Sequence, residues 1–126
     1  MAEFKTVSAG ITAADAMVKT ADVEIIEAET VCPGKYIVIL TGELSAVNAS
    51  VETAKTLHAT HLIDSFVLGN PAEEIFPAIY GASHVEVVNS LGIIETYDAA
   101  AIIVAADEAA KTADVSLIEI RLARGM

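Results

Sequence analysis

The sequence predicts an α+β fold in which helices pack against an antiparallel sheet. Two observations lead to this class: strand-like and helix-like segments alternate along the chain, and two strand-like segments are joined by a tight turn. A third observation is a segment that recurs 92 positions later, which indicates two copies of one fold.

The chain opens with a predicted helix and hairpin. Thr12 and Asp15 have the spacing of a capping box, and apolar residues then recur at helical spacing, so we expect a short helix at about residues 12–21. Residues 23–31 and 36–41 are rich in β-formers and are separated by a Pro-Gly turn. These two segments should form a β-hairpin.

A second helix, a strand and a short helix should complete the first copy. Ser45 can cap a helix whose apolar residues fall on one face; these are Val47, Val51, Ala54 and Leu57. Residues 61–68 read as a strand that Asn70-Pro71 ends, and residues 72–80 as a last short helix.

The second copy begins with the same order of elements. We expect a strand at residues 91–97, a helix at 99–113 and a strand at 115–122. One full copy is therefore strand, helix, hairpin, helix, strand, helix.

The two copies are unequally complete. Residues 13–23 and 105–115 are identical at eight of eleven positions, which chance does not explain. Residues 1–88 form the first domain, lacking most of its first strand, and residues 89–126 match the first third of a second. We expect 91–97 to fill the vacant first-strand slot, because unpaired sheet edges are unfavourable and the stub before Lys5 is short. A shortened gene product, an experimental truncation and a permuted unit all remain open as origins.

Charge and cysteine content exclude several function classes. The formal net charge is −11, with no Lys/Arg cluster, which disfavours nucleic-acid binding. The single cysteine, Cys32, cannot form an internal disulfide, in keeping with a reducing compartment.

Apolar content points to an obligate interface. Hydrophobic residues make up 54% of the chain, above the roughly 45–50% of ordinary soluble domains. The longest apolar run, residues 99–106, is too short to span a bilayer, and no secretory signal follows Met1. We therefore expect a cytoplasmic protein that buries this surface in an oligomer.

Three segments carry a family resemblance. They are Leu-Gly-Ile-Ile-Glu-Thr at 91–96, the repeated Ala-Ala-Asp-x-x-x-Lys-x-Ala-Asp-Val at 13–23 and 105–115, and Gly-Glu-Leu-Ser-Ala-Val at 42–47. Together they resemble the bacterial microcompartment (BMC) shell domain over nearly the whole chain from Lys5. The resemblance implies a ferredoxin-like α/β sandwich and a structural, non-enzymatic role.

Residues 31–36, Val-Cys-Pro-Gly-Lys-Tyr, are similar to the tandem-domain type of this family found in propanediol-utilisation compartments. That type forms trimers that imitate hexamers and hold an iron-sulfur cluster on the symmetry axis. It carries two complete domains, so the length of this chain departs from it, and the choice between trimer and hexamer stays open.

The resemblance implies specific roles for residues. Cyclic trimers or hexamers would tile into a polyhedral shell together with other shell proteins, around encapsulated enzymes. A central pore would pass electrons or small molecules, and Cys32 would ligate a 4Fe–4S cluster shared between subunits. Lys19 and Lys111 would lie at the edge where oligomers meet. The pore loop would be Val31, Cys32, Pro33, Gly34 and Lys35.

The residues themselves leave other interpretations open. Cys32 could be an inert loop thiol, or the reactive group of a redox sensor or thiol enzyme. His58 and His61 have a spacing that suits a metal, but the helix should end between them; His84 stands alone, and Glu73-Glu74 is a solvated helix start. A small trimeric nucleotide-binding regulator would need a phosphate cradle, and the sequence shows none.

Overall fold

The computed structural model describes residues 1–123 and divides them into two compact units. Unit 1 comprises Met1–Gly69 together with Ala123, and unit 2 comprises Asn70–Leu122. The predicted α+β class is confirmed. The units follow contacts within the chain rather than sequence equivalence, so the division into domains at 1–88 and 89–126 stays a prediction.

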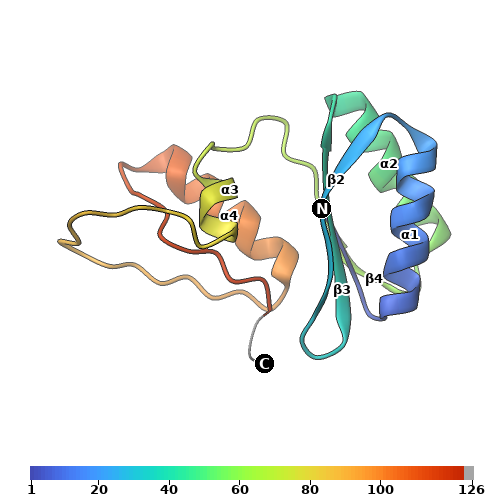
Figure 1. The fold of residues 1–126 in the computed structure, drawn as a ribbon, viewed down its shortest axis with the longest axis horizontal. Helices are drawn as coiled ribbons and strands as arrows, with labels where there is room; N and C mark the ends of the chain where they lie inside the picture. Colours follow the sequence, from blue (N-terminus) through green and yellow to red (C-terminus); the bar gives the residue numbers. More distant parts are fainter. Residues whose placement is uncertain (124–126) are drawn as a thin grey trace. The chain divides into compact units, whose positions relative to one another are not determined.

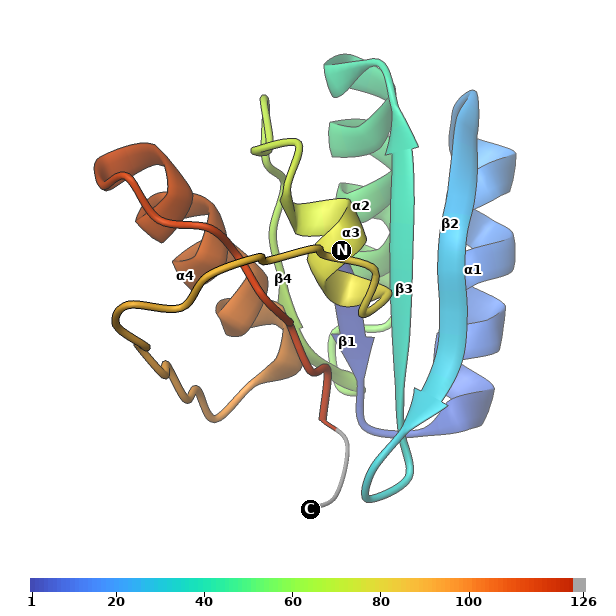
Figure 2. The same cartoon turned by 60° about the vertical axis from the view of Figure 1, so that its left-hand side comes forward.

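Unit 1 is a four-stranded antiparallel sheet with two helices on one face (Figure 1). The strand order is β2-β3-β1-β4. The strands are β1 (Ala2–Phe4), β2 (Val23–Val31), β3 (Lys35–Gly42) and β4 (Leu62–Ser65). Helices α1 (Val7–Thr20) and α2 (Leu44–Leu57) both cover the same side, as Figure 2 shows from a second direction.

The β2–β3 hairpin is the longest pairing in the sheet and was predicted from its turn residues. Its register runs from Val23 opposite Gly42 to Val31 opposite Lys35, with an irregularity between Ile25 and Glu27. The hairpin therefore projects its turn at one end of the sheet.

The core of unit 1 lies between the sheet and its two helices. Alternate residues of a strand point to the same face, so Phe4, Val38 and Leu40 all face the helices and are buried. Helix α1 contributes Ala13, Ala14 and Met17, and α2 contributes Val47, Val51 and Ala54. Small residues on α1 let the helix approach the sheet closely.

Both long helices of unit 1 begin differently from expectation. Helix α1 starts at Val7, because the Thr6 side chain accepts a hydrogen bond from the Ala9 N–H (3.4 Å) and acts as the N-cap. The Thr12 hydroxyl donates instead to the Ser8 carbonyl within the helix (3.0 Å). Ser45 lies inside α2 and is not its cap, since Glu43 holds the N-cap position without a side-chain hydrogen bond.

The first-strand slot is filled from the start of the chain. Strand β1 pairs with β3, with Ala2 opposite Val38, and on its other side with β4. The expectation that residues 91–97 fill this slot is wrong in this chain, because three residues of β1 suffice to join the two neighbouring strands.

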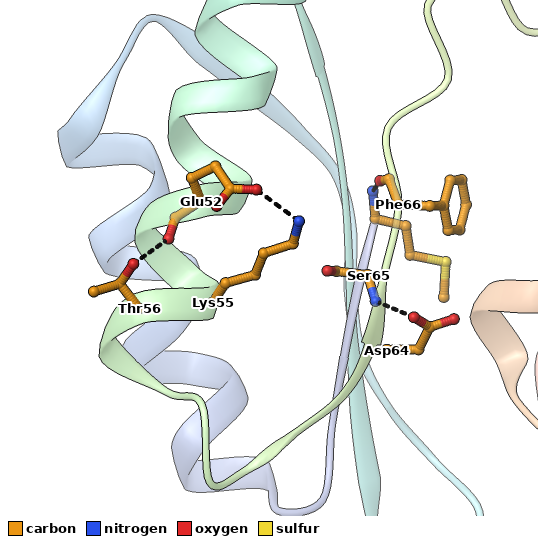
Figure 3. Close-up of polar contacts among 7 residues, drawn as sticks. Glu52, Lys55, Thr56, Asp64, Ser65 and Phe66 are labelled. Carbon is orange, nitrogen blue, oxygen red and sulfur yellow. Dashed lines mark hydrogen bonds and ion pairs between the residues drawn. The ribbon is translucent and has the colours of Figure 1, made fainter.

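Backbone contacts tie the start of the chain to β4. The Met1 amino group donates to the Phe66 carbonyl (2.9 Å), and the Phe66 N–H donates back to the Met1 carbonyl (3.1 Å). Burial lowers the pKa of the Met1 amino group to about 6. Figure 3 shows Phe66 near Asp64, whose Oδ1 accepts from the Ser65 N–H (2.8 Å).

Unit 2 contains helices α3 (Ile75–Ile79) and α4 (Ala99–Thr112). The helix expected at 99–113 is confirmed, and α3 is shorter than the expected 72–80. The strands expected at 91–97 and 115–122 are wrong, because neither segment pairs with a strand among the described residues. The Ile120 N–H donates to the Ala78 carbonyl (2.9 Å) at the end of α3, which is a single hydrogen bond and not a strand ladder. Among residues 1–123, no helix is long and apolar enough to cross a bilayer.

Candidate functional site

The turn between β2 and β3 displays the only cysteine of the chain. Cys32 is exposed, and its N–H donates to the Ala123 carbonyl (3.2 Å). The Gly34 N–H donates to the Val31 carbonyl (3.0 Å) and closes the turn. Gly34 has a φ of 101°, a conformation that residues with a Cβ rarely adopt. The sequence Cys-Pro-Gly therefore produces a compact turn that presents its thiol to solvent.

An ion pair anchors the base of this turn. Lys35, the first residue of β3, places its Nζ 2.5 Å from Oε1 of Glu3 on β1. The Glu3 side chain is fully buried, and a buried carboxylate needs such a partner because desolvation is costly. Lys35 therefore neutralises Glu3, so the predicted loop residue also has a structural role next to Cys32.

A single chain cannot hold an iron-sulfur cluster through its own side chains. Among residues 1–123, no group of three or more His, Cys, Asp and Glu side chains is placed to bind a metal ion. A cluster needs three or four thiolates, and each chain offers one. The exposed position of Cys32 is nevertheless suited to a ligand set completed by other chains. The described residues do not fit a cluster within one subunit, and a cluster shared between subunits stays a prediction.

The two predicted edge lysines make the same ion pair in different surroundings. Lys19 Nζ lies 2.6 Å from Asp15 Oδ2, and Lys111 Nζ lies 2.6 Å from Asp107 Oδ2. The first pair is exposed, whereas the Asp107 side chain is only 7% exposed. Asp107 Oδ1 also accepts a hydrogen bond from the Ala72 N–H (2.8 Å).

The environment of Asp107 stabilises its charged form. Burial alone would raise the pKa of Asp107, but hydrogen bonds from Lys111 and from the Ala72 N–H outweigh this and lower it. Sequence reasoning missed this buried carboxylate. The repeat places an aspartate four residues before a lysine in both copies, which predicts the two ion pairs but not the burial of one aspartate.

The histidines have local structural roles. His58 ends α2 and contacts the edge of the Phe4 ring, with the centroids 6.2 Å apart. The His61 N–H donates to the His58 carbonyl (2.9 Å), and the His61 Nδ1 lies 3.0 Å from the Thr60 hydroxyl. His84 lies 4.0 Å from Glu86 on the surface of unit 2.

Comparison with known families gives one match. The BMC domain matches residues 1–71 and 90–126, which is most of the chain. The second matched segment contains residues 105–115, which repeat residues 13–23 of the first.

Known proteins with similar sequences are shell proteins by name, and a protein with a similar structure is named as a microcompartments protein. The bacterial microcompartment shell protein PduT of Citrobacter freundii is 38% identical over 124 residues, covering 98% of this chain and 67% of that protein. The carboxysome shell protein CcmK2 of Thermosynechococcus vestitus is 33% identical over 79 residues, covering 60% of this chain and 78% of that one. A crystal structure of a microcompartments protein from Desulfitobacterium hafniense covers 99% of this chain and 69% of its own, with 46% identity and a TM-score of 0.84.

Proposed function

The chain belongs to the BMC domain family as a shell protein of a bacterial microcompartment or carboxysome, and from this premise we propose that it forms a cyclic oligomer whose central opening is lined by the Cys32 turn. The names of the matched relatives agree with the expected non-enzymatic role. The match to PduT over 98% of this chain supports a bacterial microcompartment, assembled in the cytoplasm, as the location of this protein.

The single observation that carries this proposal is the form of the β2–β3 turn. It projects from one end of the sheet, is closed by its own backbone hydrogen bond, and exposes the thiol of Cys32. A Cβ placed on Gly34 would meet no atom within 4 Å, so the tip of the turn is open and could approach copies of the same turn. Rotational symmetry would bring identical turns together around one axis.

Three copies of Cys32 would supply the thiolates that one chain lacks. In a trimer, three sulfur atoms would be available to a 4Fe–4S cluster, whereas a hexamer would bring six. Such a cluster, when bound, exchanges single electrons with its surroundings. The roles left to this chain are to hold Cys32 in a compact turn and to neutralise the nearby Glu3 with Lys35.

The exposed Asp15–Lys19 pair and the Lys111 side chain are proposed to lie where oligomers meet side by side. Lys19 sits in the last turn of α1 and Lys111 in the last turn of α4. Both cations face solvent at least in part, so they are accessible to a neighbouring oligomer. Their replacement by alanine should reduce sheet formation by assembled oligomers and leave the mass of a single oligomer unchanged.

The test combines oligomer mass with cluster reconstitution. Native mass spectrometry of the chain should give three or six subunits, and a stable single chain at micromolar concentration would contradict the ring. Iron and sulfide are then added without oxygen to the chain and to its Cys32→Ser variant, which differs by one atom. We expect visible absorbance and bound iron in the first only. Equal iron in both would remove Cys32 from the proposed ligand set while leaving the ring intact.

A further inference from the structure

The turn that would line the proposed opening contains one basic residue. Residues 31–35 are Val-Cys-Pro-Gly-Lys, so Lys35 is the one cation among them. Lys35 begins β3 and is paired with Val31 at the base of the turn. A lysine side chain usually extends its ammonium group into water, which would give every copy of the turn a positive charge. The position of this ammonium group therefore affects which solutes the turn attracts.

The Lys35 side chain is directed along the sheet and away from the tip of the turn. Its Nζ lies 2.5 Å from Oε1 of Glu3, and the lysine side chain is only 17% exposed. Glu3 is opposite Ile37, which is two positions further from the turn than Lys35. Alternate residues of a strand share a face, so Lys35 reaches from the base of the turn toward the centre of the sheet.

The burial of Glu3 keeps the lysine in this position. The Glu3 side chain is fully buried, and removing one partner from a buried ion pair is strongly destabilising because a buried charge is left without compensation. The Lys55–Glu52 pair on α2 differs in this respect, since its side chains are 42% and 66% exposed. Lys55 can leave its partner for water at little cost, whereas Lys35 cannot.

We propose that the Glu3–Lys35 pair determines the charge selectivity of the Cys32 turn, so that an opening lined by this turn admits uncharged or cationic small molecules in preference to anions. The inference rests on the proposed function, since only a ring places several turns around an opening. The pair neutralises the one cation of residues 31–35, and the net charge of −11 gives the whole chain a field that repels anions. A ring repeats this arrangement in every subunit.

The rate at which small disulfides modify Cys32 measures this charge in a single chain as well as in a ring. One probe is dithiobis-nitrobenzoate, which carries two carboxylates, and the other is dithiodipyridine, which is uncharged. With each probe the Cys32 sulfur forms a disulfide with one half, and the other half leaves as a coloured thiol or thiolate. The ratio of the two rate constants cancels changes in the reactivity of the thiol and retains the effect of charge.

Three variants of the full chain separate the charge of Lys35 from other effects. Glu3→Gln leaves the lysine charge uncompensated and should raise the ratio of anionic to uncharged rates about threefold to fivefold at low ionic strength. Glu3→Gln combined with Lys35→Met removes both charges and should restore the original ratio. The matched control, Glu52→Gln, makes the same change in net charge at the exposed pair on α2 and should leave the ratio nearly unchanged.

Salt dependence tests the inference without any substitution. In the unaltered chain the anionic probe should react no faster as the salt concentration is lowered, because no cation attracts it to the turn. A steep rise in its rate at low salt would overturn the inference, and so would an unchanged ratio in folded Glu3→Gln or a raised ratio in the double variant. These outcomes do not depend on assembly. A native mass of one chain would contradict the ring, whereas these rates would still report the charge of the turn.

Discussion

Replacing Gly10 by alanine should destabilise the protein, although a glycine within a helix is normally improved by this change. Gly10 lies in the middle of α1 and is buried where the helix crosses β3. A Cβ built on it would lie 2.3 Å from Tyr36 Cδ1 and 2.6 Å from Tyr36 Cβ and Cγ. Carbon atoms in van der Waals contact are about 3.5–4 Å apart, so the helix or the strand has to shift by about 1 Å.

Two opposing terms set the magnitude. Alanine has a helix propensity about 1 kcal/mol better than that of glycine. Overpacking a well-filled core costs about 1–3 kcal/mol, occasionally more. The upper part of this range applies here, because Tyr36 Cβ is fixed to the backbone of β3 and cannot rotate away. We expect Gly10→Ala to lower the free energy of unfolding by about 1–2 kcal/mol.

Urea unfolding followed by circular dichroism measures this change. The matched control is Ala49→Gly on the exposed side of α2, which reports the propensity term alone and should cost about 1 kcal/mol. If Gly10→Ala raised stability by the amount that Ala49→Gly lowers it, the close approach of α1 to Tyr36 would be refuted.

Three further predictions follow from the same structure. Lys111→Met should lower the free energy of unfolding in urea by about 1–3 kcal/mol, because it leaves the buried Asp107 carboxylate with fewer partners. Lys19→Met, at the exposed pair, should change the free energy of unfolding by less than about 0.5 kcal/mol. Equal effects of the two substitutions would contradict the difference in burial between Asp15 and Asp107. The pKa of the Met1 amino group is lowered from 8.0 to about 6 in the folded chain, so on acidification the unfolded chain takes up this proton at a higher pH than the folded chain. The free energy of unfolding should therefore fall by about 2–3 kcal/mol as the pH drops from 8 through 6. Acetylation of the Met1 amino group should abolish this part of the pH dependence. Gly34→Ala should lower the free energy of unfolding by about 1–2 kcal/mol, because Gly34 has a φ of 101°, which alanine rarely adopts. The change should appear as a lower Tm, and an unchanged Tm would argue against this backbone conformation.

Short sequence patterns correctly predicted the elements that depend mainly on neighbouring residues, namely the β2–β3 hairpin and helix α4. The Pro-Gly turn predicted the hairpin, and the pattern of residues 99–113 predicted α4. The start of α1 was missed because Thr6 and Thr12 are both plausible caps, and only the chain entering from β1 decides between them.

Tertiary context decided the rest. Residues 91–97 have the composition of a strand, but a strand also depends on a partner that lies elsewhere in the chain. Asp15 and Asp107 stand in nearly identical local sequences, and one is exposed while the other is buried. For the candidate site, the turn around Cys32 could be predicted from its residues, whereas the Lys35–Glu3 ion pair joins strands that are not adjacent in sequence.

The single, solvent-exposed Cys32 also provides a labelling site from which the symmetry of the proposed assembly can be measured. A nitroxide spin label can be attached there without any substitution, since no second cysteine competes for it. Pulsed electron paramagnetic resonance then reads the separations between labels. A three-membered ring has a single label-to-label distance, whereas a six-membered ring has three, so the shape of one distance distribution would report the symmetry around the axis.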